Sequence, residues 1–303
     1  FSRYATAPLP IADKLLSDYD DVTTAVRIRK DFGNNFITFD KDLNIPVGGF
    51  FVDPEFLELF NYQLVTGSPS DVLSKPNSVV LKEKTAIKLF GSIDVIGNII
   101  KVGEQGEYIV TGIIKDNGEQ SHIKFDALAS LSSLTRLEEQ DSVLYPTVNN
   151  WLNRWAGYVY IQLKDNVDKA SVLEHLEAIN KEQYADLEEY QHKFELQAVG
   201  EISPGPLLSN EIGPGLPLAF IYFMAGLALL VMLSAAFNYM NLSIARALTR
   251  AREVGVRKVS GATKLHLVIQ FLVEAVVLSL LALILSYVLL VFLKPAFSQL
   301  HFS

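Results

Sequence analysis

The chain has 303 residues, of which half are hydrophobic and 20% are charged, and its mean hydropathy is +0.24. This composition excludes a disordered chain and argues against a purely soluble globular protein. The net charge of -8 argues against a nucleic-acid-binding protein, so no nucleic acid is expected as a partner. The absence of cysteine excludes disulfides, zinc fingers, iron–sulfur sites and thiol nucleophiles.

The charge is distributed unevenly along the chain. From Leu216 onward there are seven Lys/Arg and two acids, whereas the first 215 residues hold 19 basic and 32 acidic side chains. An acidic polar block is therefore joined to a basic apolar block, which usually marks a domain boundary. A linker is expected at 203–217, where seven of fifteen residues are Gly or Pro.

The first half of the acidic block predicts short helices and strands in alternation. In chain order they are a helix at Ile11–Leu16, strands at Val22–Arg29, Phe36–Asp40 and Asn44–Val52, a short helix through Phe60 with Asp53 as N-cap and Pro54 at its first position, a strand at Ser78–Leu81 and a helix at Lys82–Phe90 stopped by Gly91.

The second half begins with a strong hairpin signal at 104–107. The predicted elements are the two hairpin strands at Gly97–Val102 and Tyr108–Ile114, a strand or a strand running into a helix at Ile123–Leu131, a strand at Tyr158–Leu163, a long helix at Val167–Tyr190 and a last strand at Phe194–Val199. The acidic block is thus expected to be an α+β domain.

The apolar block predicts two membrane-spanning helices. Leu216–Met240 has no charge over 25 positions. As a helix this run is about 37 Å long, enough to cross a hydrocarbon core of roughly 30 Å. A second run, Leu265–Leu293, holds one charge, Glu274. We expect spans at 218–240 and 267–293, because all-round apolar helices of this length require lipid or a very large soluble core.

The segment between the spans sets the expected orientation. Residues 241–264 carry six Lys/Arg and one Glu. By the positive-inside rule this loop faces the cytoplasm, which places residues 1–215 on the outer side of the cytoplasmic membrane. No signal peptide precedes the acidic block, so we expect an upstream span outside this sequence to have exported it.

Sites that would carry chemistry are mostly absent from the sequence. There is no Walker phosphate loop, no H-E-x-x-H pair and no G-x-S-x-G elbow. The run from Asp18 to Asp21 could be a calcium loop, but it lacks the required glycine and distal glutamate, which favours a solvated turn. An aromatic group could form a ligand-stacking surface, although core packing is the more common use of such residues: Trp151, Trp155, Tyr158 and Tyr160.

Two features of the apolar block allow alternative interpretations. Glu274 is either a bundle-facing residue or a residue that snorkels to the cytoplasmic surface. The basic loop is helix-compatible, with Gly261 as a natural stop. It is either an anchor for anionic lipid or a docking surface for a cytoplasmic partner. The residues alone do not choose between these alternatives.

A resemblance to a known family adds to this reading. Specific residue patterns occur at Phe237–Arg246, Arg252–Ala262 and Gln270–Glu274, with weaker phrases at Leu89–Gly91, Ile96-Gly97 and Ser121–Asp126. In these segments the chain resembles the MacB/FtsX-like permease family of ABC transporters, closely after residue 216 and more loosely before it. The first and the later spans of the family are not in this sequence.

The resemblance implies a mechanism and a set of partners. Such permeases are dimers or pseudo-dimers that couple ATP hydrolysis by a separate or fused ATPase to movement of the outer domain, a process called mechanotransmission. The ATPase binds ATP, so this chain would need no cofactor and would not itself be an enzyme. Expected partners are this cytoplasmic ATPase, a second permease copy or half, the lipid bilayer of a bacterial inner membrane, and periplasmic or outer-membrane components.

The resemblance also assigns residues. The ATPase-coupling region would comprise Arg252, Glu253, Val254, Gly255, Arg257, Lys258, Gly261 and Ala262, with Glu274 just inside the following span. It further implies an outer core domain over 1–202 with two lobes, one of βαβ type and the second inserted at roughly 120–190, and an FtsX-like region over 218–303. The main alternative is a two-span sensor or structural membrane protein with an extracytoplasmic ligand-binding domain. The early return of the chain to the membrane disfavours a sensor, and no outer catalytic constellation supports a membrane-bound hydrolase.

Overall fold

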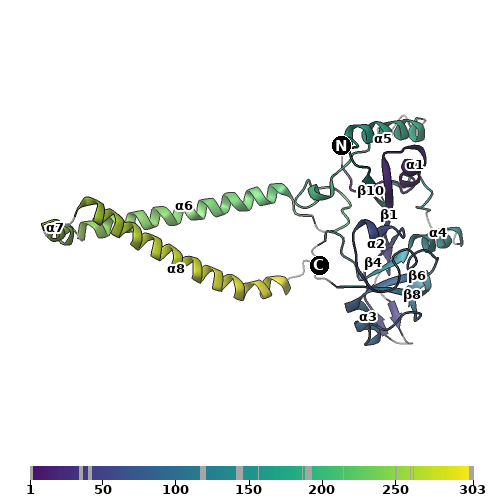
Figure 1. Ribbon diagram of the computed structural model, residues 1–303, viewed down its shortest axis with the longest axis horizontal. Helices are drawn as coiled ribbons and strands as arrows, with labels where there is room; N and C mark the ends of the chain where they lie inside the picture. The colour runs from purple at the N-terminus through teal and green to yellow at the C-terminus, as the bar shows by residue number, and fades with distance from the viewer. Residues whose placement is uncertain are drawn as a thin grey trace. The chain divides into compact units, whose positions relative to one another are not determined.

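The computed structural model describes residues 3–33, 37–39, 43–116, 121–140, 146–155, 157–185, 187, 193–213, 215–249, 251–259, 261 and 263–299. The chain divides into two compact units, Phe1–Ile221 and Tyr222–Ser303, and each is described here by itself (Figure 1).

The first unit is built on one mixed sheet with helices on it. Its described strands are β1 (Val22–Phe32), β2 (Ile37–Phe39), β3 (Leu43–Ile45), β4 (Gly49–Val52), β5 (Leu64–Thr66), β6 (Ser78–Lys82), β7 (Ile99–Val102), β8 (Gly106–Ile114), β9 (Ala127–Ser130) and β10 (Gly157–Leu163). Its helices are α1 (Ile11–Asp18), α2 (Phe56–Leu59), α3 (Glu83–Phe90), α4 (Leu131–Gln140) and α5 (Lys169–Tyr184), with 3-10 turns η1 (Gly103–Gln105) and η2 (Val199–Glu201).

The strand order in the sheet is β10-β1-β4-β9-β6-β8-β7-β2-β3, and β5 pairs with β8. Two pairs are parallel, β4 with β9 and β6 with β8, and the other pairs are antiparallel. Strands adjacent in the sheet are therefore often distant in the sequence. The segment 120–190 contributes β9 and β10 to this same sheet, and its expected role as an inserted lobe remains a prediction.

Both faces of the central sheet are covered, which explains why β6 is buried along almost its whole length. Val79 and Leu81 pack into a cluster with α3 and α4, whereas Val80 packs on the opposite face with Val26 and Phe56. Such strands read as continuous apolar runs because neither side faces water. At the β1/β10 edge, α1 and α5 cover a third cluster.

Several local signals are confirmed. Helix α3 ends at Gly91, which has φ 71° and donates its N–H to the Ile87 carbonyl as a left-handed cap. The predicted hairpin is present as β7 and β8. The segment that was expected to run from a strand into a helix does so as β9 and α4. The long helix is shorter than predicted, Lys169–Tyr184, and positions 186 and 188–190 of the prediction lie outside the described residues.

Two local predictions are wrong. Asp53 is not a helix cap: α2 begins at Phe56, and the Asp53 carboxylate instead accepts from the Arg27 backbone N–H and guanidinium on β1. The segment Phe194–Val199 is not a strand. Phe194 and Leu196 are half-buried against the α1/α5 cluster. The alternation of apolar and polar residues in this segment therefore reflects packing on that cluster and not pairing with another strand.

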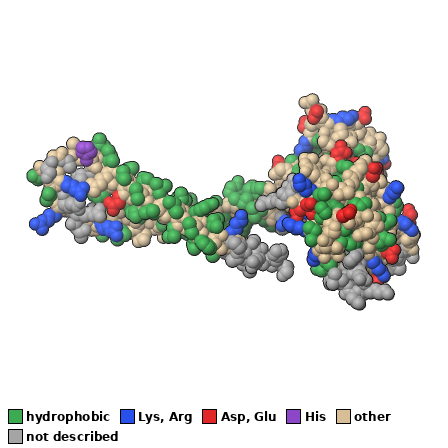
Figure 2. All heavy atoms as spheres, turned by 60° about the horizontal axis from the view of Figure 1, so that its bottom comes forward, with side chains coloured by type: hydrophobic (Ala, Val, Ile, Leu, Met, Phe, Trp, Pro, Cys, Tyr) green, Lys and Arg blue, Asp and Glu red, His purple; other side chains and the backbone are tan. Residues whose placement is uncertain are grey.

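The second unit is helical. After α6 (Leu218–Thr249), which begins in the first unit, it contains α7 (Ala251–Val259) and α8 (Lys264–Gln299). Leu218–Arg246 and Val268–Lys294 are long and apolar enough to cross a membrane. Figure 2 shows green hydrophobic side chains along both long helices and blue basic side chains around α7. The predicted class, a mixed α/β domain followed by two apolar helices consistent with transmembrane spans, is confirmed.

Candidate functional site

The basic segment between the apolar helices folds as a separate short helix. Helix α7 ends at Val259, and Gly261, with φ +96°, donates its N–H to the carbonyl of Lys258. The Thr263 hydroxyl then accepts the N–H of His266 and caps the start of α8. A glycine stop and a threonine cap placed this close force the chain to turn between the two helices.

Helix α7 presents charge and apolar surface together. The side chains of Arg252, Arg257 and Lys258 are exposed, and Val254 is half-buried. Val259 is 90% exposed. Arg252 and Val259 lie seven positions apart and therefore on nearly the same side of the helix. The helix thus carries a mixed surface of basic and branched apolar groups.

Arg257 ties α7 to the second span. Its Nη1 donates to Oε1 of Gln270 on α8 at 2.6 Å. A hydrogen bond from a guanidinium is stronger than one between neutral groups, although solvent exposure reduces its net value. The bond links the orientation of α7 to the first turns of α8.

Gly255 lies inside α7 and is exposed, and a Cβ added there would meet no atom within 4 Å. Glycine inside a helix costs roughly 0.5–1 kcal/mol relative to alanine. Packing with the described residues of this chain does not account for that cost.

Three other residues were predicted to belong to this region or to the following span. Glu253 lies in α7, but the structure does not describe its side chain, and Ala262 lies outside the described residues. Glu274 is half-buried in α8, inside the apolar stretch Val268–Lys294. Both interpretations of Glu274 remain open.

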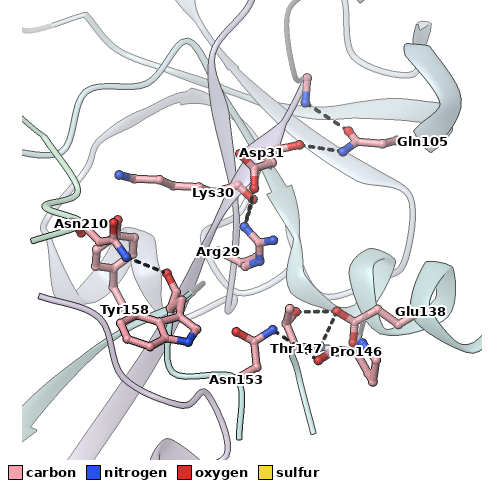
Figure 3. Close-up of polar contacts among 12 residues, drawn as sticks. Arg29, Lys30, Asp31, Gln105, Glu138, Pro146, Thr147, Asn153, Tyr158 and Asn210 are labelled. Atoms are coloured by element: carbon pink, nitrogen blue, oxygen red, sulfur yellow. Dashed lines mark hydrogen bonds and ion pairs between the residues drawn. The ribbon is translucent and has the colours of Figure 1, made fainter. Parts of the chain in front are cut away.

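The Gly/Pro-rich segment 203–217, called the connector below, packs on the first unit. Lys30 Nζ donates to the Glu211 carbonyl at 2.6 Å, and the Tyr158 hydroxyl donates to the Asn210 carbonyl at 2.8 Å. The Glu211 carboxylate accepts the N–H groups of Leu208 and Gly215. Figure 3 shows Lys30, Tyr158 and Asn210 together at this contact. Sequence composition alone did not predict it.

Close backbone contacts explain the glycines of the connector. A Cβ at Gly213 would overlap the carbonyl oxygen of His122, and one at Gly205 would overlap the carbonyl oxygen of Glu201. Gly205 also accepts from the N–H of Leu218, the first residue of α6. The connector is therefore attached to the sheet at one end and to the first turn of the span at the other.

The aspartates from Asp18 to Asp21 have protein partners. Asp21 accepts from the Ser171 hydroxyl at 2.7 Å and pairs with His175 Nε2 at 2.8 Å, which together hold the pKa of its carboxyl below the usual range. Asp18 accepts from Lys14 and Ser17, which lowers its pKa. Among the described residues, His, Asp and Glu side chains form no group of three suited to a metal ion.

The aromatic residues separate into core and surface. Tyr158 is 3% exposed and Tyr160 is half-buried, both in the cluster beneath the connector, so core packing applies to them. Trp151 is half-buried against the α1/α5 cluster. Trp155 is 45% exposed and packs edge-to-face on Tyr4.

A small polar hollow near α4 was not predicted. It has a volume of about 150 Å³, and its lining includes Arg27, Asp53, Ser130, Ser132 and Thr135. The Arg27 guanidinium already donates to Asp53 and Asp13. Burial disfavours the charged guanidinium, but these carboxylates outweigh it and raise the Arg27 pKa. We interpret the pair as structural, joining β1 to the residue that follows β4.

Comparison with known proteins gives the family. The MacB-like periplasmic core domain family matches residues 2–179, and the FtsX-like permease C-terminal family matches residues 225–303. No curated protein matches.

One solved structure shares the fold at a TM-score of 0.50, and two others are similar at lower scores. A domain described as belonging to a permease protein from Porphyromonas gingivalis matches at 20% identity and TM-score 0.50, covering 59% of this chain and 72% of that chain. The periplasmic region of MacB from Actinobacillus actinomycetemcomitans matches at 12% and 0.45, covering 60% and 76%. The extracellular domain of the ABC-type transporter YknZ from Gram-positive bacteria matches at 14% and 0.43, covering 59% and 84%. Because the periplasmic core family covers more than half of the sequence, the chain belongs to the MacB/FtsX-like permease family of ABC transporters and is a membrane protein with an extracytoplasmic domain.

Proposed function

We propose that this chain is a permease subunit in which α7 docks on a cytoplasmic ATPase and passes its movement through the spans to the outer domain. The observation that carries the proposal is the combination found on α7: exposed basic side chains and an exposed Val259 on a short helix held to α8 through Arg257 and Gln270. A helix with this surface can both bind a partner and transmit a displacement.

The α7 surface supports protein docking over simple lipid anchoring. A lipid anchor requires positive charge, which Arg252 and Lys258 supply. It does not require a glycine in the middle of the helix, and Gly255 has open space on its outer side. A glycine there allows the backbone of another protein to approach closely.

The connector supplies the outer half of the proposed path. The first residue of α6 donates to Gly205, and the connector is bonded to β1 through Lys30. A displacement of α6 would therefore act on a segment that is packed on the first unit, and not on a flexible linker.

The remaining parts of the proposal follow from the family. ATP would bind to the partner ATPase, this chain would need no cofactor, and a second permease copy or half would complete the transporter. The membrane would be the bacterial inner membrane, with the basic segment in the cytoplasm, as the positive-inside rule requires. Further periplasmic or outer-membrane components would meet the outer domain.

The test is co-purification of the full-length protein, reconstituted in nanodiscs, with candidate ABC ATPases from the same organism. The variant carries Arg252→Glu and Lys258→Glu, which reverse two exposed charges and leave the Arg257–Gln270 bond in place. We expect one ATPase to co-purify with the wild-type protein. The amount that co-purifies with the variant should be at least tenfold lower.

A matched control makes the same charge change elsewhere. Lys101→Glu with Lys115→Glu reverses two exposed charges on the outer unit and should leave ATPase retention unchanged. Retention of the ATPase by both variants, or failure of any ATPase to bind the wild type, would overturn the docking role. If the Arg252→Glu, Lys258→Glu variant keeps the ATPase and instead gathers less anionic lipid around it in nanodiscs of mixed lipid, α7 is a lipid anchor.

A further inference from the structure

An exposed aromatic cluster lies on the outer unit, away from the sheet core. Tyr4 is 40% exposed and Trp155 is 45% exposed, and their rings meet edge-to-face with centroids 4.5 Å apart. The Arg154 guanidinium lies over the Trp155 ring at 4.7 Å. We call Tyr4, Arg154, Trp155 and Leu207 the Trp155 patch.

The connector holds this patch together. Ala5 donates its N–H to the Ser209 carbonyl, and Ser209 donates to the Arg3 carbonyl, so the chain around Tyr4 runs beside the connector. Asn210 Nδ2 donates to the Trp155 carbonyl at 3.5 Å. Leu207, in the same segment, is 75% exposed. A large apolar side chain held this far out of the core contributes nothing to the stability of the unit by burial.

The same segment touches the start of the first span. Leu218 donates its N–H to the Gly205 carbonyl, and Gly205 donates to the Leu216 carbonyl. Leu207 lies two residues from Gly205, and two residues of chain reach at most about 7 Å. The apolar stretch able to cross a membrane begins at Leu218. Leu207 therefore lies close to the residue that bonds to the first residue of α6.

The composition of the patch fits lipid headgroups. Trp and Tyr concentrate at membrane–water interfaces, where an apolar ring and a polar edge both find partners. An arginine beside them can pair with lipid phosphate in a bidentate manner. Leu207 adds an apolar group of the kind that enters the acyl boundary.

We propose that the Trp155 patch lies in the headgroup layer of the outer leaflet and seats the extracytoplasmic domain on the bilayer. The occupant of this surface is phospholipid. The proposal depends on α6 being a membrane span and does not depend on ATPase docking by α7.

The protein carries two natural reporters for this test. Residues 1–303 contain two tryptophans, Trp151 and Trp155, and Trp151 is half-buried against the α1/α5 cluster. Every tryptophan of the full-length protein outside these residues is replaced by Phe in all variants. In Trp151→Phe the fluorescence then comes from Trp155, and in Trp155→Phe it comes from Trp151. The full-length variants are reconstituted in nanodiscs of phosphatidylcholine brominated near the headgroup end of the acyl chains, and iodide serves as an aqueous quencher.

We expect the brominated lipid to quench Trp155 at least twofold more strongly than Trp151. Arg154→Glu in the Trp151→Phe background should reduce this lipid quenching, because the charge that meets phosphate is reversed. Strong iodide quenching of Trp155 without lipid quenching would show that the patch faces water and would overturn the proposal. Shielding of Trp155 from both quenchers would show that protein covers the patch, which would overturn it equally.

Discussion

Lys30 on β1 and Glu211 in the connector are joined through a hydrogen bond of 2.6 Å from the lysine Nζ to the glutamate carbonyl. The ammonium also lies 5.2 Å from the centre of the Tyr158 ring. Burial lowers the pKa of Lys30 because it disfavours the charged ammonium, and a carbonyl partner in this partly dry environment partly offsets that cost. The bond links β1 to the chain that leads into α6.

Removing this bond should release the connector. In Lys30→Met the side-chain volume is largely kept but the donor is lost, and the Glu211 carbonyl loses its charged partner. We expect faster amide hydrogen exchange over 205–213, by about tenfold for a loss of roughly 1.4 kcal/mol. Mass-spectrometric exchange on the full-length protein measures this. Lys101→Met, on an exposed lysine of β7, is the control, and equal exchange in both variants would contradict the role of Lys30.

Gly213 should tolerate no side chain. An added Cβ would overlap the backbone carbonyl of His122, and backbone cannot move aside as a flexible side chain can. We expect Gly213→Ala to lower stability by about 1–3 kcal/mol, the usual range for overpacking. Thermal unfolding of the detergent-solubilised protein provides the measurement. Gly200→Ala, where an added Cβ meets no atom within 4 Å, should unfold like the wild type, and a similar fall in both would disprove the close contact.

Two substitutions of Gly255 should have different effects, one on the stability of α7 and one on the affinity for the ATPase. Gly255→Ala fits the open space around it and should stabilise α7 by about 0.5–1 kcal/mol. Gly255→Leu should lower ATPase affinity by more than tenfold, because a bulky group would hold off the backbone of the docked partner. Titration of the purified ATPase against reconstituted permease gives the dissociation constants. Unchanged affinity in Gly255→Leu would place the ATPase contact elsewhere, and Gly200→Leu on the outer unit controls for a general effect.

His122 should make the outer unit sensitive to mild acid. Burial lowers its pKa below the ordinary value of 6.5, and Nε2 lies 2.9 Å from the Tyr160 hydroxyl. The unfolded chain therefore binds the proton first as the pH falls. The stability contributed by neutral His122 is present above pH 6.5 and is lost as the pH falls toward its folded pKa.

His122→Gln removes the titration and keeps a side chain that can hydrogen-bond to Tyr160. Between pH 7.5 and pH 5 the unfolding temperature of this variant should fall less than that of the wild type. Measuring the difference between the two slopes cancels the contribution of the other titrating groups. Identical slopes would exclude His122 as a source of the pH dependence.

Much of the membrane part could be predicted without a structure. Leu216–Met240 is uncharged, and the segment after it is basic. In lipid, a span must satisfy its backbone hydrogen bonds within itself, so composition and length over one stretch decide the outcome. The same holds for Gly91 after α3 and for the β7–β8 hairpin, whose signals lie within a few residues of each other.

The sequence predicted that the coupling residues lie on a helix, but it did not predict the contacts that they make. The pattern predicted a helix with a stop at Gly261, and α7 with its glycine end matches this. The bond from Arg257 to Gln270 depends on how the chain turns between α7 and α8. Their assignment to ATPase coupling remains a prediction.

The sequence by itself determined the elements whose signals are local: the apolar helices, the glycine-stopped helix α3 and the alternation in the strands. Only the tertiary structure decided the pairing of β4 with β9, the use of Asp53 by Arg27 and the packing of the connector on Lys30 and His122. Those contacts join segments that lie tens to nearly two hundred residues apart. No local pattern encodes them, because a carboxylate three positions before a helix, such as that of Asp53, can cap the helix or pair with a distant guanidinium. The partner available in the folded chain decides which.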